Sequence, residues 1–134
     1  MSTVRPLVQD SGGLGKNLRG GDAVINCAQP QVVATDGNIS LTVTDVLRGV
    51  ISFSGFTAGR NLTVPTAALL LAAAPNLEVG ESLVLEVGIS VAYAGTLVTA
   101  TGITLKGAAT IPASGKGKLY FTKTSATTMD CLVI

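Results

Sequence analysis

The sequence contains no histidine and no tryptophan, and charged residues make up only 13% of its 134 positions. Without histidine, Ser-His-Asp and Cys-His nucleophile systems are excluded, and so are metal sites built on imidazole. Aromatic residues are only 4% of the chain, which argues against a platform on which nucleic-acid bases stack. The net charge is +1, and the dispersed basic residues form no stripe of the kind that binds nucleic acid. We therefore expect no histidine-based catalysis and no nucleic-acid partner.

The remaining catalytic motifs are also incomplete. A glycosidase needs two facing carboxylates, whereas Glu81 and Glu86 are five residues apart and would point to opposite faces of one strand. The stretch from Gly12 to Asn17 matches a phosphate-binding loop only in part. Asp10 stands where that motif has its first glycine, and Asn17 replaces its hydroxyl residue. We therefore predict no catalytic residue, no cofactor and no metal site, and we expect that the chain is not an enzyme.

The two cysteines, Cys27 and Cys131, lack the spacing of metal ligands. Cysteine is among the residues most often buried as a small hydrophobic side chain. We therefore predict two buried, reduced thiols in strands. A disulfide between them is the alternative, and sequence spacing alone does not decide between the two.

Hydrophobic residues are abundant, at 47% of the chain with a mean hydropathy of +0.54. A typical domain carries about 25% charged residues, so this chain either enters a membrane or buries much of its surface against partners. A membrane-spanning helix needs roughly 20 apolar residues, and the best run, Ala67 to Ala74, is stopped by Pro75. No secretory signal pattern opens the sequence. We therefore expect a soluble oligomer that stays in the cytoplasm where it is made.

Residues 1–22 differ in composition from the rest of the chain. They contain Pro6, five glycines, several charges and a single short apolar patch at Leu7 and Val8. This composition favours turns and extended backbone, and such a segment cannot bury enough surface by itself. We predict an extended N-terminal arm over residues 1–22, ordered on a partner, and a β domain over residues 23–134.

The β domain shows many short strand patterns separated by turn residues. Expected strands cover residues 23–27, 31–34, 39–44, 46–53, 61–64, 82–91, 96–100, 103–105, 109–111, 118–124 and 127–134. One helix is predicted near residues 66–74, with Thr66 as its N-cap and Pro75 as its stop. Its residues are apolar on every side, so we expect it to be buried. Together these patterns predict an all-β fold, an antiparallel β-sandwich or barrel that is jelly-roll-like.

Several sequence stretches resemble phage structural proteins. The segment Arg5–Asp10, followed by Leu18–Asp22 after glycines, is similar to the start of many phage structural subunits. Further matching stretches are residues 62–66, 75–82, 100–105, 107–111 and 120–124. Over most of its length the chain resembles the family of tailed-phage capsid decoration (cement) and head-fibre proteins. The resemblance implies a trimer, an N-terminal arm that lies on neighbouring subunits, and no catalysis.

We therefore expect a virion structural protein, made in the bacterial cytoplasm, that decorates the outer capsid surface as a homotrimer. Its partners would be its own copies and the major capsid protein, with no nucleic acid and no membrane. In the arm, Pro6, Leu7 and Val8 could add an edge strand or fill a groove on the capsid. Arg5, Lys16 and Arg19 are the basic arm residues that could pair with acidic capsid residues.

A fibre or adsorption module that binds host glycans is the alternative function. Carbohydrate sites commonly stack sugars on aromatic rings. The rings available for such stacking are Phe53, Phe56, Tyr93, Tyr120 and Phe121.

Overall fold

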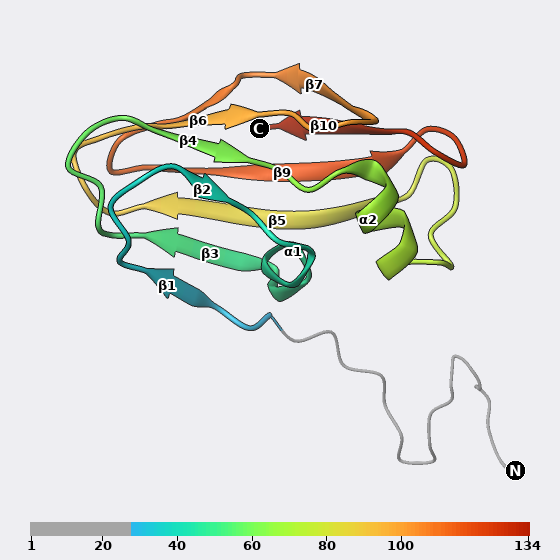
Figure 1. The fold of residues 1–134 in the computed structure, drawn as a ribbon, viewed down its shortest axis with the longest axis horizontal. Helices are drawn as coiled ribbons and strands as arrows, with labels where there is room; N and C mark the ends of the chain where they lie inside the picture. Colours follow the sequence, from blue (N-terminus) through green and yellow to red (C-terminus); the bar gives the residue numbers. More distant parts are fainter. Residues whose placement is uncertain (1–27) are drawn as a thin grey trace, which may run out of the picture.

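The computed structural model describes residues 28–134, which form strands in two sheets together with two short helices (Figure 1). The six-stranded sheet has the spatial order β1 (Gln31–Val33), β3 (Val50–Phe53), β5 (Ser82–Ile89), β9 (Lys116–Lys123), β10 (Met129–Val133) and β7 (Ile103–Gly107). The four-stranded sheet has the order β2 (Ile39–Ser40), β4 (Arg60–Thr63), β6 (Gly95–Val98) and β8 (Thr110–Ile111). The helices are α1 (Val43–Arg48) and α2 (Ala67–Ala73). The predicted arm, 1–22, and the predicted strand 23–27 lie outside the described residues.

The two sheets are mixed, so the prediction of antiparallel sheets is wrong. β1, β3 and β5 run parallel to one another, and so do β2, β4 and β6. The later strands β8 and β9 pair antiparallel with β6 and β5. Both sheets have free ends in their strand order, so neither closes into a barrel. The strand-rich character that the sequence predicted is confirmed.

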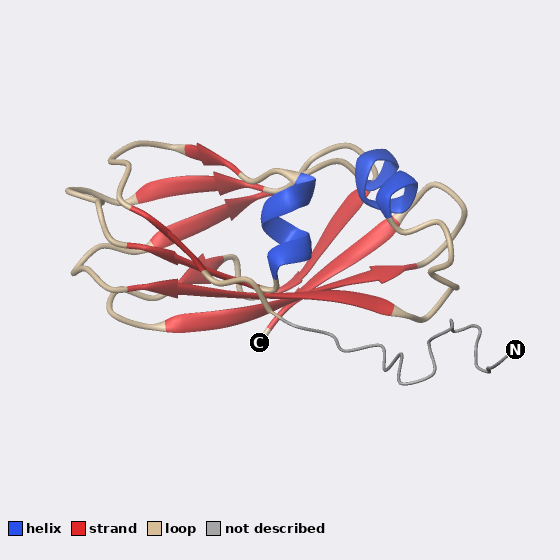
Figure 2. Ribbon diagram, turned by 90° about the horizontal axis from the view of Figure 1, so that it is seen from below, coloured by secondary structure: helices blue, strands red, loops and turns tan. Residues whose placement is uncertain are grey.

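The parallel pairing arises because the chain alternates between the sheets. It passes from a strand of the six-stranded sheet through a turn to a strand of the four-stranded sheet, and then returns to the first sheet. We call each such unit an arch; the first three arches are residues 31–40, 50–63 and 82–98. Equivalent residues are in register, with Ile39 beside Leu62 and Leu62 beside Leu97. The arches therefore stack on one another, as Figure 2 shows from below.

The turns of the arches also contact one another closely. The N–H of Ser54 donates to the carbonyl of Val33 (2.9 Å), and the N–H of Ser90 donates to the carbonyl of Phe53 (3.1 Å). A Cβ placed on Gly55 would lie only 1.9 Å from the backbone oxygen of Ala34. Glycine at this position therefore allows the second turn to pass directly against the first.

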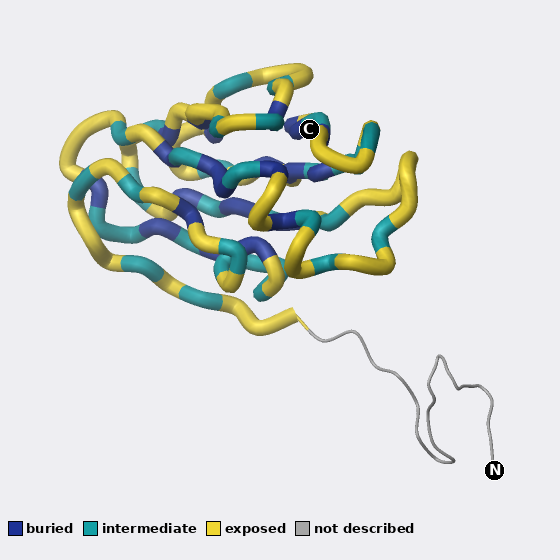
Figure 3. Tube along the Cα trace, turned by 45° about the vertical axis from the view of Figure 1, so that its right-hand side comes forward, coloured by how far each residue is buried: buried dark blue, intermediate teal, exposed yellow. Residues whose placement is uncertain are grey.

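The hydrophobic core lies between the sheets. Along β5, Leu85, Val87 and Ile89 are buried whereas Val84 and Glu86 point outward, which is the two-residue period of a strand. Buried residues of β3, β4, β6, β9 and β10 join the same cluster. In Figure 3 these buried positions alternate with intermediate or exposed ones along the chain.

Helix α2 confirms the predicted helix near residues 66–74. The Thr66 hydroxyl accepts a hydrogen bond from the N–H of Leu69 (3.3 Å), as expected of an N-cap, and Ala74 and Pro75 follow the last turn. The prediction that the whole helix is buried is wrong. Leu70 is fully buried, whereas Leu69 is 57% exposed. The helix covers the core with one face only.

Helix α1 was not predicted, because the alternation of Ile39, Leu41 and Val43 favours a strand. Capping hydrogen bonds at Thr42 stabilise the start of a helix here instead. The Thr42 hydroxyl accepts from the N–H of Asp45 (3.1 Å), and the Asp45 carboxylate accepts from the N–H of Thr42 (2.9 Å). This reciprocal pair satisfies two free donors of a helix start. Gly49, in the left-handed region (φ 86°), ends the helix.

Candidate partner-binding face

The outer face of the six-stranded sheet carries a row of apolar side chains on three adjacent strands. Val84 of β5 lies beside Tyr120 of β9, and Tyr120 lies beside Leu132 of β10. Val84 is 43% exposed and Leu132 39% exposed, and Ile134, two residues after Leu132, is 75% exposed. An outer sheet face in contact with water is normally polar. We call the row Val84, Tyr120 and Leu132, with the neighbouring Ile134, the apolar row.

Charged and hydroxyl side chains flank the apolar row. On one side Glu86 lies beside Lys118, and the Lys116 amine lies 3.6 Å from a Glu86 carboxylate oxygen. On the other side are Asp130 and the hydroxyls of Ser82 and Thr122, which share a 2.6 Å hydrogen bond. The exposed Lys116–Glu86 pair adds little stability. The face thus presents both signs of charge on one side of the apolar row, and one carboxylate with two hydroxyls on the other.

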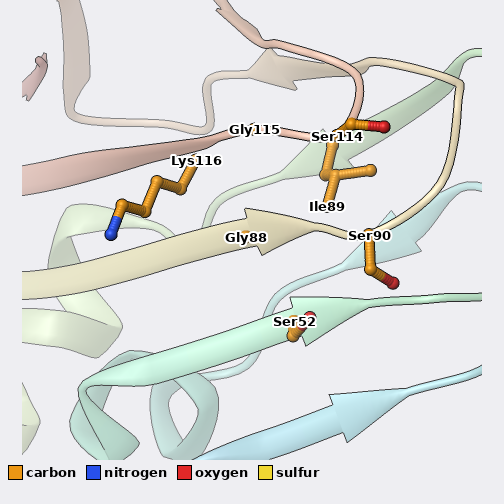
Figure 4. A pocket seen from close by; sticks show the side chains of 7 residues that line it. All are labelled: Ser52, Gly88, Ile89, Ser90, Ser114, Gly115 and Lys116. Carbon is orange, nitrogen blue, oxygen red and sulfur yellow. The ribbon is translucent and has the colours of Figure 1, made fainter.

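Two shallow hollows adjoin each other on this face and share Lys116. One, of about 390 Å³, is lined by Glu86, Lys116–Lys118, Tyr120 and Ile134. The other, of about 340 Å³, is lined by Ser52, Gly88–Ser90 and Ser114–Lys116 (Figure 4). Gly88 contributes no side chain, which leaves the second hollow open.

The polar groups of the second hollow do not converge on one point. The Ser90 hydroxyl donates to the carbonyl of Phe53 (3.4 Å), and the Ser114 hydroxyl donates to that of Val91 (3.3 Å). In Figure 4 the Lys116 amine and the Ser114 hydroxyl point in opposite directions. A nucleophile needs a base within hydrogen-bond reach, and these contacts provide none. The hollow is therefore an open surface depression whose described polar groups form no nucleophile–base pair.

No family model matches the chain, and no curated protein or solved structure does.

The two strongly shifted acid–base groups of the described chain have structural explanations. The hydroxyl and N–H of Thr57 and the guanidinium of Arg60 lower the pKa of Asp36 to about 2 from 3.8. These contacts join the turn of the first arch to that of the second. Burial raises the pKa of the Cys131 thiol to about 11.

Cys131 is buried and free, as predicted, whereas Cys27 lies outside the described residues. Within residues 28–134, no three His, Cys, Asp or Glu side chains gather where they could hold a metal ion. Neither described helix is long and apolar enough to cross a membrane.

The aromatic side chains give few surfaces for sugar stacking. Phe53, Phe56 and Phe121 are buried, and the rings of Phe53 and Phe56 stack on each other with centroids 5.3 Å apart. Tyr93, in the turn after β5, and Tyr120, on the outer face, keep exposed surface. These two tyrosines lie on different parts of the fold.

All six predicted arm contacts, Arg5, Pro6, Leu7, Val8, Lys16 and Arg19, lie outside the described residues, so their roles stay predictions. The apolar row was not predicted as a site. Its signal is in the sequence, because Val84, Tyr120 and Leu132 each sit between two apolar neighbours that are buried or packed against the core. The three residues become neighbours only through the register in which β5, β9 and β10 pair, and the sequence does not show this register.

Proposed function

We propose that this chain is a structural, non-catalytic subunit of a tailed-phage particle: a capsid decoration protein that coats and stabilises the outer surface of the head as a homotrimer. The observation that carries the proposal is the apolar row on the outer sheet face. Covering this row would remove apolar surface from water, at about 25 cal/mol per Å². Only 13% of the residues are charged, so the chain has few charges with which to cover its surface. A contact between copies would bury apolar surface that those charges cannot cover.

Charge on this face suits a cyclic assembly. Contacts in a three-fold ring are heterologous, so one part of a surface meets a different part of the next copy. Lys116 and Lys118, with the single carboxylate Glu86 between their strand and β3, lie on one side of the apolar row, and Asp130 lies on the other. Lysines of one copy would then approach Asp130 of the next. We take the two sheets of each copy as the layers of a β-sandwich whose inner faces form the core.

Attachment to the capsid is assigned to residues 1–22. Pro6, Leu7 and Val8 would pair with the major capsid protein by strand addition, and Arg5, Lys16 and Arg19 would pair with its acidic residues. Three arms on one trimer raise the effective concentration of the second and third contacts. Particle attachment and trimer formation therefore use different parts of the chain.

Co-sedimentation with phage heads that lack the protein tests this function. We expect the full chain to coat the heads and to raise their resistance to heat or chelators. Deleting residues 1–22 should abolish coating and leave the trimer intact. Failure of the full chain to bind heads would contradict the proposal. Specific binding to a host glycan array would favour an adsorption module instead.

A further inference from the structure

Gly88 lies within the paired part of β5, between Ser52 of β3 and Lys116 of β9. A glycine in a strand costs conformational entropy and offers no side chain to pack. A Cβ added to Gly88 would have only the Ser52 hydroxyl oxygen within 4 Å, at 3.9 Å, and the backbone there is not left-handed. Among residues 28–134, therefore, neither crowding nor backbone conformation requires a glycine at this position.

The other glycines in the described strands have reasons inside the fold. A Cβ added to Gly95 or to Gly117 would lie 2.8 or 2.9 Å from a buried core side chain. Gly107 has a φ of +79°, a conformation that favours glycine. Of the glycines in the described strands, only Gly88 has no such reason. Its missing side chain points to a contact from outside the fold, because strand glycines also occur where another chain or a ligand approaches closely.

The missing side chain leaves a notch in the outer face of the six-stranded sheet. One row across four strands consists of Val32, Ser52, Gly88 and Lys116. Val32 is 67% exposed and the Lys116 side chain is 75% exposed, so larger side chains stand at both ends of this row. The hollow of about 340 Å³ over Gly88, shown in Figure 4, lies between them. We call this hollow the Gly88 notch.

The lining of the Gly88 notch favours a guest that fits by shape. The hydroxyls of Ser90 and Ser114 already donate to backbone carbonyls (3.4 and 3.3 Å). The Lys116 amine lies 3.6 Å from a Glu86 carboxylate oxygen. A small polar ligand needs several polar groups that converge on it, whereas these groups point in different directions (Figure 4). An apolar side chain needs no such groups.

The Gly88 notch is continuous with the apolar row. The adjoining hollow, of about 390 Å³, shares Lys116 with the notch and is lined by Tyr120 and Ile134 of the apolar row. A partner surface that covers the apolar row thus reaches the notch without a break. Each copy of the chain also presents large apolar side chains that could enter a notch, among them Val79 (66% exposed) and Leu69 (57% exposed).

We propose that the Gly88 notch receives an apolar side chain of a second copy of this chain, and that this contact fixes how neighbouring copies align. The inference rests on the proposed function, in which copies meet on this face. Interface cores are packed as densely as protein interiors, and Gly88 provides the space that such packing needs.

Gly88→Leu tests the contact by filling the notch. Light scattering over a dilution series of the full chain gives the concentration at which half of the chains are monomeric. We expect Gly88→Leu to raise this concentration on the order of 100-fold, as for the loss of a central interface contact, and Gly88→Ala to raise it less. Thr96→Leu, on the outer face of the other sheet, is the control and should leave it unchanged. A Gly88→Leu trimer as stable as the parent overturns the inference.

Thermal melts separate an interface role of Gly88 from a role in folding. They are recorded in the Leu132→Glu background, or at a dilution where the parent and Gly88→Leu are both monomeric. Because no described atom crowds position 88, Gly88→Leu should not lower the melting temperature of the monomer. A clear fall would show that the glycine serves the fold of one chain, and would overturn the inference.

Protection of a thiol in the notch gives an independent readout. Ser52→Cys places a thiol in the notch with almost no added volume, in a full chain that carries Cys27→Ser; Cys131 is buried. Alkylation at position 52 should be on the order of ten times slower in the trimer than in the monomer obtained by dilution or by Leu132→Glu. Ser40→Cys, on the other sheet, should react equally fast in both.

Equal alkylation rates at position 52 in trimer and monomer overturn the inference. Equal protection in both overturns it too, because residues of the same chain would then fill the notch.

The outcomes also separate this inference from the proposed function. A trimer that Leu132→Glu dissociates and Gly88→Leu does not contradicts only the inference. A trimer that Gly88→Leu dissociates and Leu132→Glu does not supports the notch and contradicts assembly through the apolar row. A parent chain that is monomeric at every concentration contradicts both.

Discussion

Asp36 shows how one residue joins two arches. Its carboxylate accepts from the N–H and hydroxyl of Thr57 (3.0 and 2.6 Å) and from the Arg60 guanidinium (2.8 Å). In the sequence, Asp36-Gly37-Asn38 is a local turn pattern and nothing more. The partners lie 21 and 24 residues further on, so no local pattern could identify them.

Asp36→Asn should therefore change the acid stability of the fold. The folded-state pKa is about 2 against an ordinary 3.8, so the carboxylate stabilises the fold above about pH 4. This contribution is lost as the pH falls from about 4 to about 2. At neutral pH the variant should have a lower melting temperature than the parent protein. This difference in melting temperature should disappear between pH 4 and pH 2. Thermal melts of both proteins over this pH range measure the difference, and a difference that stays constant would contradict the account.

Gly55 tests the close passage of the first two turns. Gly55→Ala would place a Cβ 1.9 Å from the Ala34 oxygen, so the turns must separate. We expect a loss of about 2 kcal/mol or more in unfolding free energy by urea titration, as for overpacked sites. Gly37→Ala is the control, because no atom lies within 4 Å of its added Cβ. Equal losses in the two variants would show that the turns do not pack as described.

At the scale of elements, the sequence predicted most strands and helix α2 within a few residues. Local signals were sufficient there: a two-residue alternation, the Thr66 cap and Pro75. Helix α1 was missed because alternation in Ile39, Leu41 and Val43 competed with the Thr42–Asp45 capping box. Parallel pairing was missed as well, because pairing joins residues that are 20 to 36 positions apart and the pattern of one strand does not identify its partner.

Helix α2 provides a matched pair of substitutions. Leu70→Ala removes a side chain with no exposed surface, whereas Leu69→Ala removes one that is 57% exposed. We expect Leu70→Ala to cost about 2–5 kcal/mol of unfolding free energy and Leu69→Ala less than about 0.5 kcal/mol. Chemical denaturation measures both. A large loss in Leu69→Ala would mean that α2 buries another face, or that copies of the chain cover it.

At the scale of the whole molecule, composition predicted that some surface would need a partner. It could not say which surface, because alternation along one strand marks an outward side chain and not its neighbours in space. The register of β5, β9 and β10 assembles the apolar row from residues far apart in sequence. The outer face of the four-stranded sheet is more polar. Val98 is exposed there, but its neighbours are Ser40, Asn61, Thr63, Thr96 and Thr110.

The solution mass of the full chain, measured by light scattering, tests the central claim most directly. We predict about 40 kDa for three chains of 13.5 kDa. Leu132→Glu places a charge in the apolar row and should reduce the mass to that of one chain. Thr110→Glu, on the other sheet, should leave the trimer intact. A monomeric full chain, or a trimer that survives Leu132→Glu unchanged, would contradict an assembly through the apolar row.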